Sequence, residues 1–273
     1  PKDPAVPAEA VIPSQGRGVL HLFFHVRRDA TDGAGGAARD FAARIEGFDQ
    51  RDGCQVLAFS VLGQKADFGL MALAPDLAAL DRFSVELAAA PLGQVLVPAA
   101  SYLSLTEISE YVSTEEDEAK RLIEQENMDP SSPGYDAALA AFRERMATYT
   151  RNKLTPQLPS RRVISFYPMS KRRDPGGNWY TLDLADRKAL MAGHAAVGRR
   201  YRGRVLQLIT GSVGLDDWEW GVTLLADDPA AIKQIVYEMR FDAVSATYAE
   251  FGPFVTGLVM PPTELMHHLQ LTG

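Results

Sequence analysis

The sequence is poor in cysteine and has no long apolar run. Its one cysteine among 273 residues is Cys54, so neither a disulfide framework nor a cysteine-ligated zinc site is expected, and a reducing, cytoplasmic setting is predicted. No apolar run approaches the roughly 18 residues of a membrane span, so no span is predicted. The opening PKDPAVPAEAVIPSQG lacks the basic and then apolar pattern of a signal peptide. Residues 1–16 are therefore expected to form a flexible tail.

The bulk composition is that of a soluble globular protein, with 46% hydrophobic and 23% charged residues. A chain of this length forms one large domain or two ordinary ones. The net charge is −7, which gives no general reason for a basic surface. A local concentration of cations would therefore point to a specific acidic ligand.

Two parts of the chain show the same order of predicted elements. In the first part, residues 17–112, the patterns predict a strand at 19–26, a helix at 37–48, strands at 54–63 and 67–74, a helix at 76–90 and a strand at 94–105. In the second part, residues 159–273, they predict a strand at 162–169, a helix at 184–201, strands at 205–212 and 218–226, a helix at 228–251 and a strand at 253–260.

The repeat is also visible in individual residues. Residues 67–83 align with residues 219–235, and Gly69 then matches Gly221 while Asp76 matches Asp228. A repeat of this period indicates a duplicated domain. The sequence therefore predicts an α+β protein with two tandem ferredoxin-like domains, each β-α-β-β-α-β with helices on one face of an antiparallel sheet.

An acidic, proline-containing stretch separates the two predicted domains. Residues 107–136 contain ten Asp or Glu against two Lys or Arg. We expect residues 113–158 to form a surface insertion with one or two exposed helices, acting as a solvated connector.

A basic segment follows, from Lys153 to Arg204, with twelve Lys or Arg against three Asp and a local net charge of +9. Nucleic acid is one candidate ligand, although neither a stacking platform nor a recognition helix is evident. A compact ligand with several carboxylates or phosphates fits equally well. A basic face that only balances the acidic insertion is the third interpretation.

His194 and Gln207 are the polar residues that the patterns single out within this segment. His194 shares a helix face with apolar residues such as Met191, which is compatible with a core histidine as well as a ligand. Gly193 and Gly198 beside it favour close approach of something bulky. Gln207 lies on an apolar strand face and needs a partner, either across the sheet or in a cavity. Haem, flat and edged with carboxylates, is the candidate ligand.

The strings YPMSKRR…NWY, GRRYRGRVLQLITGSVGLDDWEWGVTLL and YEMRFDAVSATYAEFGPF closely resemble the coproheme decarboxylases of the chlorite dismutase-like superfamily. The resemblance is dense over about 160–260 and weaker over 17–112. It implies two ferredoxin-like domains per subunit of the dimeric α+β barrel type, haem in the C-terminal domain and a homopentamer. It also implies that hydrogen peroxide drives the decarboxylation of propionates 2 and 4 of coproheme to vinyl groups, which gives protohaem.

The resemblance further implies a role for each of eight residues. Coproheme is both substrate and redox centre, its iron is the one metal expected, and His194 is its axial ligand. Tyr167 is the catalytic tyrosine that becomes a radical, and Gln207 is the distal residue. The propionate-binding residues are Met169, Lys171, Arg240, Ser245 and Lys153. Lys153 departs from the arginine that many relatives carry fourteen residues before the tyrosine, which weakens the assignment of this site.

Three other functions compete with this one. Chlorite dismutase shares the implied fold but uses a distal arginine where this chain has Gln207. A non-enzymatic haem carrier would keep His194 but has little use for Tyr167 beside a propionate cluster. A nucleic-acid or protein-interaction module would use the basic segment. On the resemblance, we expect coproheme, peroxide, further copies of the chain and, transiently, the enzyme that inserts the iron as partners, and no nucleic acid.

Overall fold

The computed structural model describes residues 14–30 and 35–272. Most of the predicted tail lies outside the described residues. Strand β1, Gln15–Val26, begins at Gln15, two residues before the predicted start of the first domain. Within the described part of the chain, no helix combines the length and the apolar character needed to cross a membrane.

The first part of the chain has the predicted order of elements. After β1 come α1 (Gly35–Asp49), β2 (Gln55–Leu62), β3 (Phe68–Ala74), α2 (Leu77–Ala89) and β4 (Leu96–Glu107), with short 3-10 helices at Arg28–Ala30 and Gly93–Val95. Every residue of β3 is buried, as expected for a central strand. Helix α2 begins where the Asp76 carboxylate accepts a hydrogen bond from the Ala79 amide, 2.8 Å away.

The second part repeats this order and then departs from it. It contains β5 (Val163–Lys171), a 3-10 helix (Trp179–Thr181), α5 (Leu184–Arg200), β6 (Val205–Gly211), β7 (Trp220–Ala226), α6 (Pro229–Met239), α7 (Ala243–Tyr248), β8 (Ala249–Phe251), β9 (Val255–Val259) and α8 (Pro262–His268). The predicted single helix at 228–251 is wrong. Asp242 starts a new helix by accepting from the Ser245 amide at 3.2 Å, and the last three residues pair with β5 as a strand.

All the described strands pair antiparallel, and the chain of paired strands closes on itself. Within the first part the order is β4-β1-β3-β2, and within the second it is β6-β7-β5-β9. Pairs β4–β6 and β2–β9 join the two parts. The eight strands therefore form a closed circuit, and β8 adds to the edge of β5 beyond β9. This mixed α+β fold with an antiparallel sheet confirms the predicted class.

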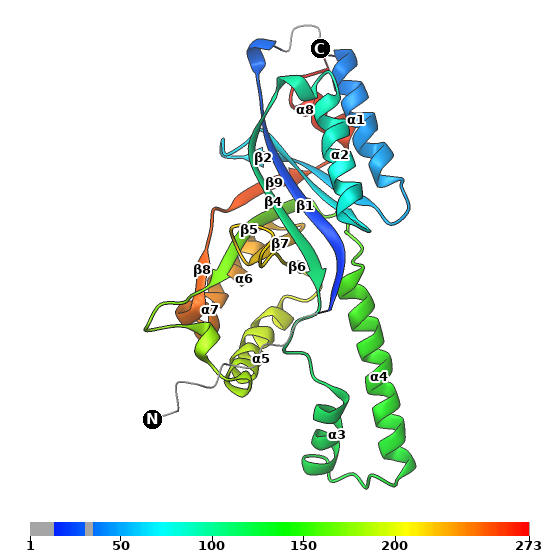
Figure 1. Ribbon diagram of the computed structural model, residues 1–273, viewed down its shortest axis with the longest axis vertical. Helices are drawn as coiled ribbons and strands as arrows, with labels where there is room; N and C mark the ends of the chain where they lie inside the picture. Colours follow the sequence, from blue (N-terminus) through cyan, green and yellow to red (C-terminus); the bar gives the residue numbers. More distant parts are fainter. Residues whose placement is uncertain (1–13, 31–34, 273) are drawn as a thin grey trace.

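Helices cover the outside of the circuit at two places (Figure 1). Helices α1, α2 and α8 lie together over the first part, while α5, α6 and α7 lie over the second. The inside holds a separate apolar cluster that includes Phe23, Phe59 and Phe166. Helix α8 follows the last predicted strand, yet its buried Leu265 and Met266 join the core of the first part.

The predicted connector contains two helices, α3 (Glu115–Glu124) and α4 (Pro133–Leu154), which project from the rest of the molecule in Figure 1. Its far end is not simply a solvated link. The Thr106 hydroxyl donates to the Leu154 carbonyl at 2.7 Å, and this bond fixes the last turn of α4 against β4. Lys153 is thereby held beside the sheet.

Candidate functional site

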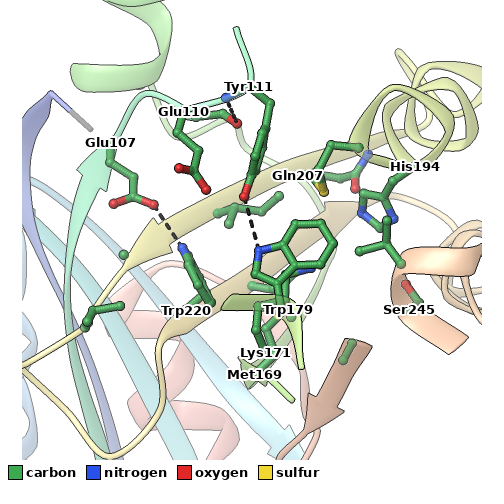
Figure 2. Close-up of a pocket in the computed structure, with 18 of the residues that line it drawn as sticks. Glu107, Glu110, Tyr111, Met169, Lys171, Trp179, His194, Gln207, Trp220 and Ser245 are labelled. Atoms are coloured by element: carbon green, nitrogen blue, oxygen red, sulfur yellow. Dashed lines mark hydrogen bonds between the residues drawn. The ribbon is translucent and has the colours of Figure 1, made fainter. Parts of the chain in front are cut away.

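A cavity of about 590 Å³ lies against the outer face of the second part of the sheet. Strands β5, β6 and β7 form its wall, and residues from α4, α5, α6, α7 and the segment after β4 surround it. Figure 2 shows His194 and Gln207 on one side of this cavity and Glu107 and Glu110 on the other. All eight residues singled out from the sequence line it: Lys153, Tyr167, Met169, Lys171, His194, Gln207, Arg240 and Ser245.

The two-residue period of a strand explains why three of these residues come from β5. Tyr167, Met169 and Lys171 alternate with residues that point the other way, and Phe166, directly before Tyr167, belongs to the cluster inside the circuit. Antiparallel pairing extends the wall sideways, since Tyr167 lies opposite Val222 and Met169 opposite Trp220. Gln207 lies one period before Ile209 on β6 and shares this face, so its predicted position on an apolar face is confirmed.

Tyr167 is almost fully buried, with 6% of its surface exposed. Its ring stacks on Phe254 with centroids 4.2 Å apart. Burial raises the pKa of the Tyr167 phenol to about 12, although the positive charge of Arg240 opposes the shift. The phenol is therefore protonated at neutral pH and faces the cavity as a neutral O–H group.

His194 comes from α5, and the residue that orients it comes from the break between α6 and α7. Its Nδ1 lies 2.8 Å from the Asp242 carboxylate. When the Nδ1–H group donates a hydrogen bond to this carboxylate, the lone pair of the neutral ring is on Nε2. Metal-bound histidines in proteins commonly have such a partner on the second nitrogen. His194 is therefore suited to bind one metal ion through Nε2.

Lys171 ends β5 in an aromatic environment. Its Nζ lies 4.1 Å from the centre of the Trp179 ring, a cation–π contact. Trp179 in turn donates from Nε1 to the Tyr111 hydroxyl at 3.2 Å. Burial lowers the pKa of Lys171 to about 8, and the carboxylates of Asp242, Glu219 and Glu110 only partly offset this effect.

Arg240 and Ser245 flank Asp242 in sequence and approach the cavity from the α6–α7 break. The Arg240 guanidinium lies 3.8 Å from the centre of the Phe251 ring and is otherwise exposed. Ser245 is buried in the first turn of α7. The break that the sequence did not predict is therefore what brings these two residues to the site.

Lys153 reaches the cavity from the last turn of α4. It is half-buried and its Nζ lies 5.9 Å from the centre of the Tyr149 ring. Burial lowers the pKa of Lys153, so this ammonium gains from an anionic neighbour. Lys153, the residue whose role the sequence supported least, thus lines the same cavity as the other predicted residues.

The two glycines of α5 behave differently from each other. A Cβ on Gly198 would lie 3.1 Å from the Gln207 amide nitrogen, so a side chain there would press on Gln207. A Cβ on Gly193 would meet nothing described within 4 Å. Another side chain of the protein therefore lies close to the backbone at Gly198, whereas none of the described residues does so at Gly193.

The basic segment is divided between two tasks. Three of its twelve cations line the cavity: Lys153, Lys171 and Arg187. Several others pair with acids nearby, in the ion pairs Arg161–Asp227, Arg173–Glu219, Arg200–Glu238 and Lys188–Asp117. The Lys188–Asp117 pair joins α5 to α3 of the acidic connector, so part of the segment does balance that connector.

The family model for chlorite dismutase matches residues 35–260. The chain belongs to the chlorite dismutase family. A protein of Oceanobacillus iheyensis named coproheme decarboxylase is 40% identical over 213 residues, which cover 78% of this chain and 76% of the relative. This relationship confirms the resemblance found in the sequence and the prediction that the chain is an enzyme.

Solved structures give the same fold. A haem-binding protein from Thermus thermophilus aligns with a TM-score of 0.79 at 32% identity, over 97% of this chain and 99% of that one. A variant of chlorite dismutase from Candidatus Nitrospira defluvii aligns with a TM-score of 0.70 at 18% identity, over 95% of this chain and 97% of that one. The second likeness is one of fold alone.

Sequence reasoning missed several residues that line this cavity. Trp179, Tyr111, Trp220 and Arg187 line the cavity, and Asp242 orients His194. Glu107 and Glu110 also line it, although neither was given a role at the site from the sequence. Periodicity would have found Glu107, because it lies two residues after Leu105 on the same strand face.

Proposed function

We propose that this protein is a coproheme decarboxylase that uses hydrogen peroxide to convert propionates 2 and 4 of iron coproporphyrin III to vinyl groups. One observation carries the proposal: eight residues picked from one resemblance, and spread over 93 positions from Lys153 to Ser245, converge on one cavity. The Oceanobacillus relative named coproheme decarboxylase and the Thermus haem-binding structure support the same ligand class.

The reaction balances without a further cofactor. Each propionate loses carbon dioxide, one proton and two electrons to become a vinyl group, and hydrogen peroxide takes up two electrons and two protons to become two water molecules. Coproheme supplies the redox-active iron and is itself the substrate. Each decarboxylation therefore consumes one proton from the surroundings.

The donor set of the cavity fits such a substrate. His194 offers Nε2 to the iron because Asp242 holds the other ring nitrogen. Lys153, Lys171 and Arg240 offer cations to the propionates, since carboxylates in a partly apolar cavity need charged partners. Aromatic and apolar side chains such as Met191 and Phe251 line the remainder and suit the porphyrin face.

Tyr167 is assigned the transfer of hydrogen from the substrate. Its phenol is protonated at neutral pH, since burial raises its pKa to about 12, so it can lose a proton and an electron together. A tyrosyl radical formed in this way can abstract hydrogen from the β-carbon of a propionate. Lys171 lies two periods along the same strand face and also lines the cavity, which supports a role in holding the carboxylate of that propionate.

The Tyr167→Phe variant tests this assignment. Phenylalanine keeps the ring packing against Phe254 but has no O–H group to oxidise. We expect coproheme to bind with similar affinity, peroxide to be consumed or to bleach the porphyrin, and no decarboxylated product to appear by mass spectrometry. Protohaem forming at about a tenth of the normal rate would instead indicate the loss of one hydrogen bond and would overturn the radical role.

Chlorite breakdown is the alternative activity in this family. In the resemblance its chemistry relies on a distal arginine, and the matching position here is the neutral Gln207 in the cavity wall. A haem carrier without activity is the other alternative. Three parallel assays separate these functions. Product from coproheme with peroxide indicates the decarboxylase, and breakdown of chlorite by the protein with protohaem indicates chlorite dismutase. Binding of either porphyrin without reaction in both assays indicates a carrier.

The proposal also covers the ferredoxin-like units of the fold, the number of subunits and the cellular location. The element order and the strand order β4-β1-β3-β2 are what two tandem ferredoxin-like units would give, closed into one barrel. We further propose that the chain works as a homopentamer in the cytoplasm and receives coproheme by transient contact with the enzyme that inserts its iron. Mass measurement in solution tests the number of subunits.

A further inference from the structure

Two carboxylates line a cavity whose proposed ligand is itself rich in carboxylates. Glu110 has a cationic neighbour, since the Arg187 guanidinium lies 3.8 Å away. Glu107 has none within 4 Å among residues 14–30 and 35–272, and its Oε1 accepts instead from the neutral Trp220 Nε1 at 3.0 Å. An ionised Glu107 would repel an incoming propionate, so its presence in the wall needs an explanation.

The position of Glu107 is built into the sheet. Glu107 lies one period after Leu105 on β4, and Leu105 pairs with Gly211 on β6. A Cβ on Gly211 would overlap the Glu107 carboxylate. Trp220, the hydrogen-bond donor, lies opposite Gly211 on the other side. The strand thus lacks a side chain at the one place where the carboxylate needs room.

The surroundings of Glu107 favour its protonated form. Partial burial raises the pKa of Glu107, the hydrogen bond from Trp220 opposes this shift, and the negative charge of Glu110 adds to it. The other charged groups that line the cavity are Lys153, Lys171, Arg187 and Arg240. Among all of these, Glu110 acts most strongly on Glu107. A further carboxylate placed nearby would raise the pKa of Glu107 again.

We propose that Glu107 takes up a proton when a porphyrin carboxylate enters the cavity and, as a neutral acid, donates a hydrogen bond to it. Trp220 holds the other oxygen of Glu107, which leaves the protonated oxygen for the ligand. The proton comes from solvent, and an O–H bond is the only bond formed. This inference rests on the proposed function, because that function supplies the ligand class.

Proton uptake on binding tests the inference directly. Coproheme is titrated into the wild-type protein and into Glu107→Gln at pH 6.5 in weak buffer, with an indicator dye as the readout. At this pH Lys171 is already charged in the free protein, since its pKa is about 8. We expect the wild type to take up about one proton more than Glu107→Gln for each coproheme bound. Equal uptake by the two proteins would overturn the proposal.

Two further variants sharpen the result. Gly211→Ala keeps Glu107 but displaces its carboxylate, and we expect it to lose the same proton uptake. Glu264→Gln removes an exposed carboxylate on α8, away from the cavity, and should behave as the wild type does. Normal uptake by Gly211→Ala, or loss of uptake by Glu264→Gln, would contradict the proposal.

Failure of the proposed function would look different. A wild-type protein that does not bind coproheme, or that binds it but forms no decarboxylated product with peroxide, would overturn the proposed function itself. A wild-type protein that binds coproheme and forms product, with uptake equal to that of Glu107→Gln, would overturn the Glu107 assignment alone.

Discussion

At the scale of single residues, burial opposes the charge of Lys171. Its pKa of about 8 is well below the usual value near 10.4, because most of its side chain is removed from water. A lowered pKa means that the charged form is disfavoured in the free protein. A propionate beside Lys171 would reverse this effect by stabilising the ammonium.

The pH dependence of coproheme binding follows from this pKa. Below pH 8 Lys171 is charged before binding, while above pH 8 it must take up a proton to pair with a propionate. We expect the dissociation constant to rise about tenfold from pH 7 to pH 9 in the wild type. Lys171→Arg stays charged throughout this range and should give a flat profile in a titration followed by Soret absorbance. Parallel slopes for the two proteins would contradict the assignment.

Gln207 is expected to tune the reaction rather than to enable it. As a neutral amide it can offer hydrogen bonds worth about 0.5–1.5 kcal/mol each. Gln207→Ala should therefore slow protohaem formation about two- to tenfold in a steady-state assay, without abolishing it. Complete absence of product after long incubation would assign Gln207 a larger role. Gln207→Arg introduces the distal arginine that the chlorite dismutases carry. Chlorite breakdown by this variant would indicate that the two activities share one fold, and it would not change the function proposed for the wild type.

At the scale of elements, the break between α6 and α7 serves two functions through one carboxylate. Asp242 caps α7 through the Ser245 amide and also bonds the ring of His194. The two functions separate on substitution. Asparagine is as good an N-cap as aspartate, but it provides no negative charge for the imidazole.

We therefore predict different outcomes for two variants of Asp242. Asp242→Asn should keep its thermal stability but bind coproheme roughly 10- to 100-fold more weakly, as other lost partners of metal-binding histidines do. Asp242→Ala should lose about 1 kcal/mol of stability in addition, because the cap is removed. Thermal unfolding and coproheme titration check both, with His194→Ala as the reference for complete loss of the ligand. Asp242→Asn with wild-type affinity would contradict the proposed role of the Asp242–His194 hydrogen bond.

This break also marks the limit of prediction from sequence. The apolar period that runs through Ile232, Ile235 and Val236 predicts a helix but does not indicate where it ends. At the break, Asp242 caps α7 through the Ser245 amide and also bonds His194, 48 positions away, a partner that no local pattern reveals. Helix α8 escaped prediction for a similar reason, since its burial comes from packing on α1. The strands were predicted well, because alternation is a local property.

The same distinction holds for the candidate site. Tyr167, Met169 and Lys171 could be found because one strand carries them on one face. Trp179 could not be assigned to the cavity in advance, since its position depends on a partner from another element, Tyr111. Family resemblance supplied residues such as Arg240 that no local pattern distinguishes.

At the scale of the whole molecule, the closed strand circuit makes each part of the chain depend on the other. Strand β9 lies between β2 of the first part and β5 of the second, and Gly257 pairs with Val61 on one side and Ile164 on the other. A Cβ on Gly257 would overlap the Ser60 carbonyl and lie 2.7 Å from the Phe59 ring. Any side chain there forces the two parts apart at their junction.

We predict that Gly257→Ala lowers the free energy of unfolding by about 1–3 kcal/mol through overpacking. Gly47→Ala, in α1 where nothing described lies within 4 Å, is the matched control and should raise it by up to about 1 kcal/mol. The three tryptophans, Trp179, Trp218 and Trp220, all belong to the second part, so their fluorescence reports on that part while circular dichroism reports on the whole.

If the circuit couples the two parts, Gly257→Ala should shift both signals to the same lower midpoint in thermal unfolding, as a cooperative unit requires. A fluorescence transition that separates from the dichroism transition would instead mean that the second part unfolds independently. In that case the wall that β5, β6 and β7 form could be lost while Leu105 and Glu107 of β4, which also line the cavity, stay folded. Coincident transitions would mean that a substitution at the remote β2–β9 junction destabilises the whole cavity.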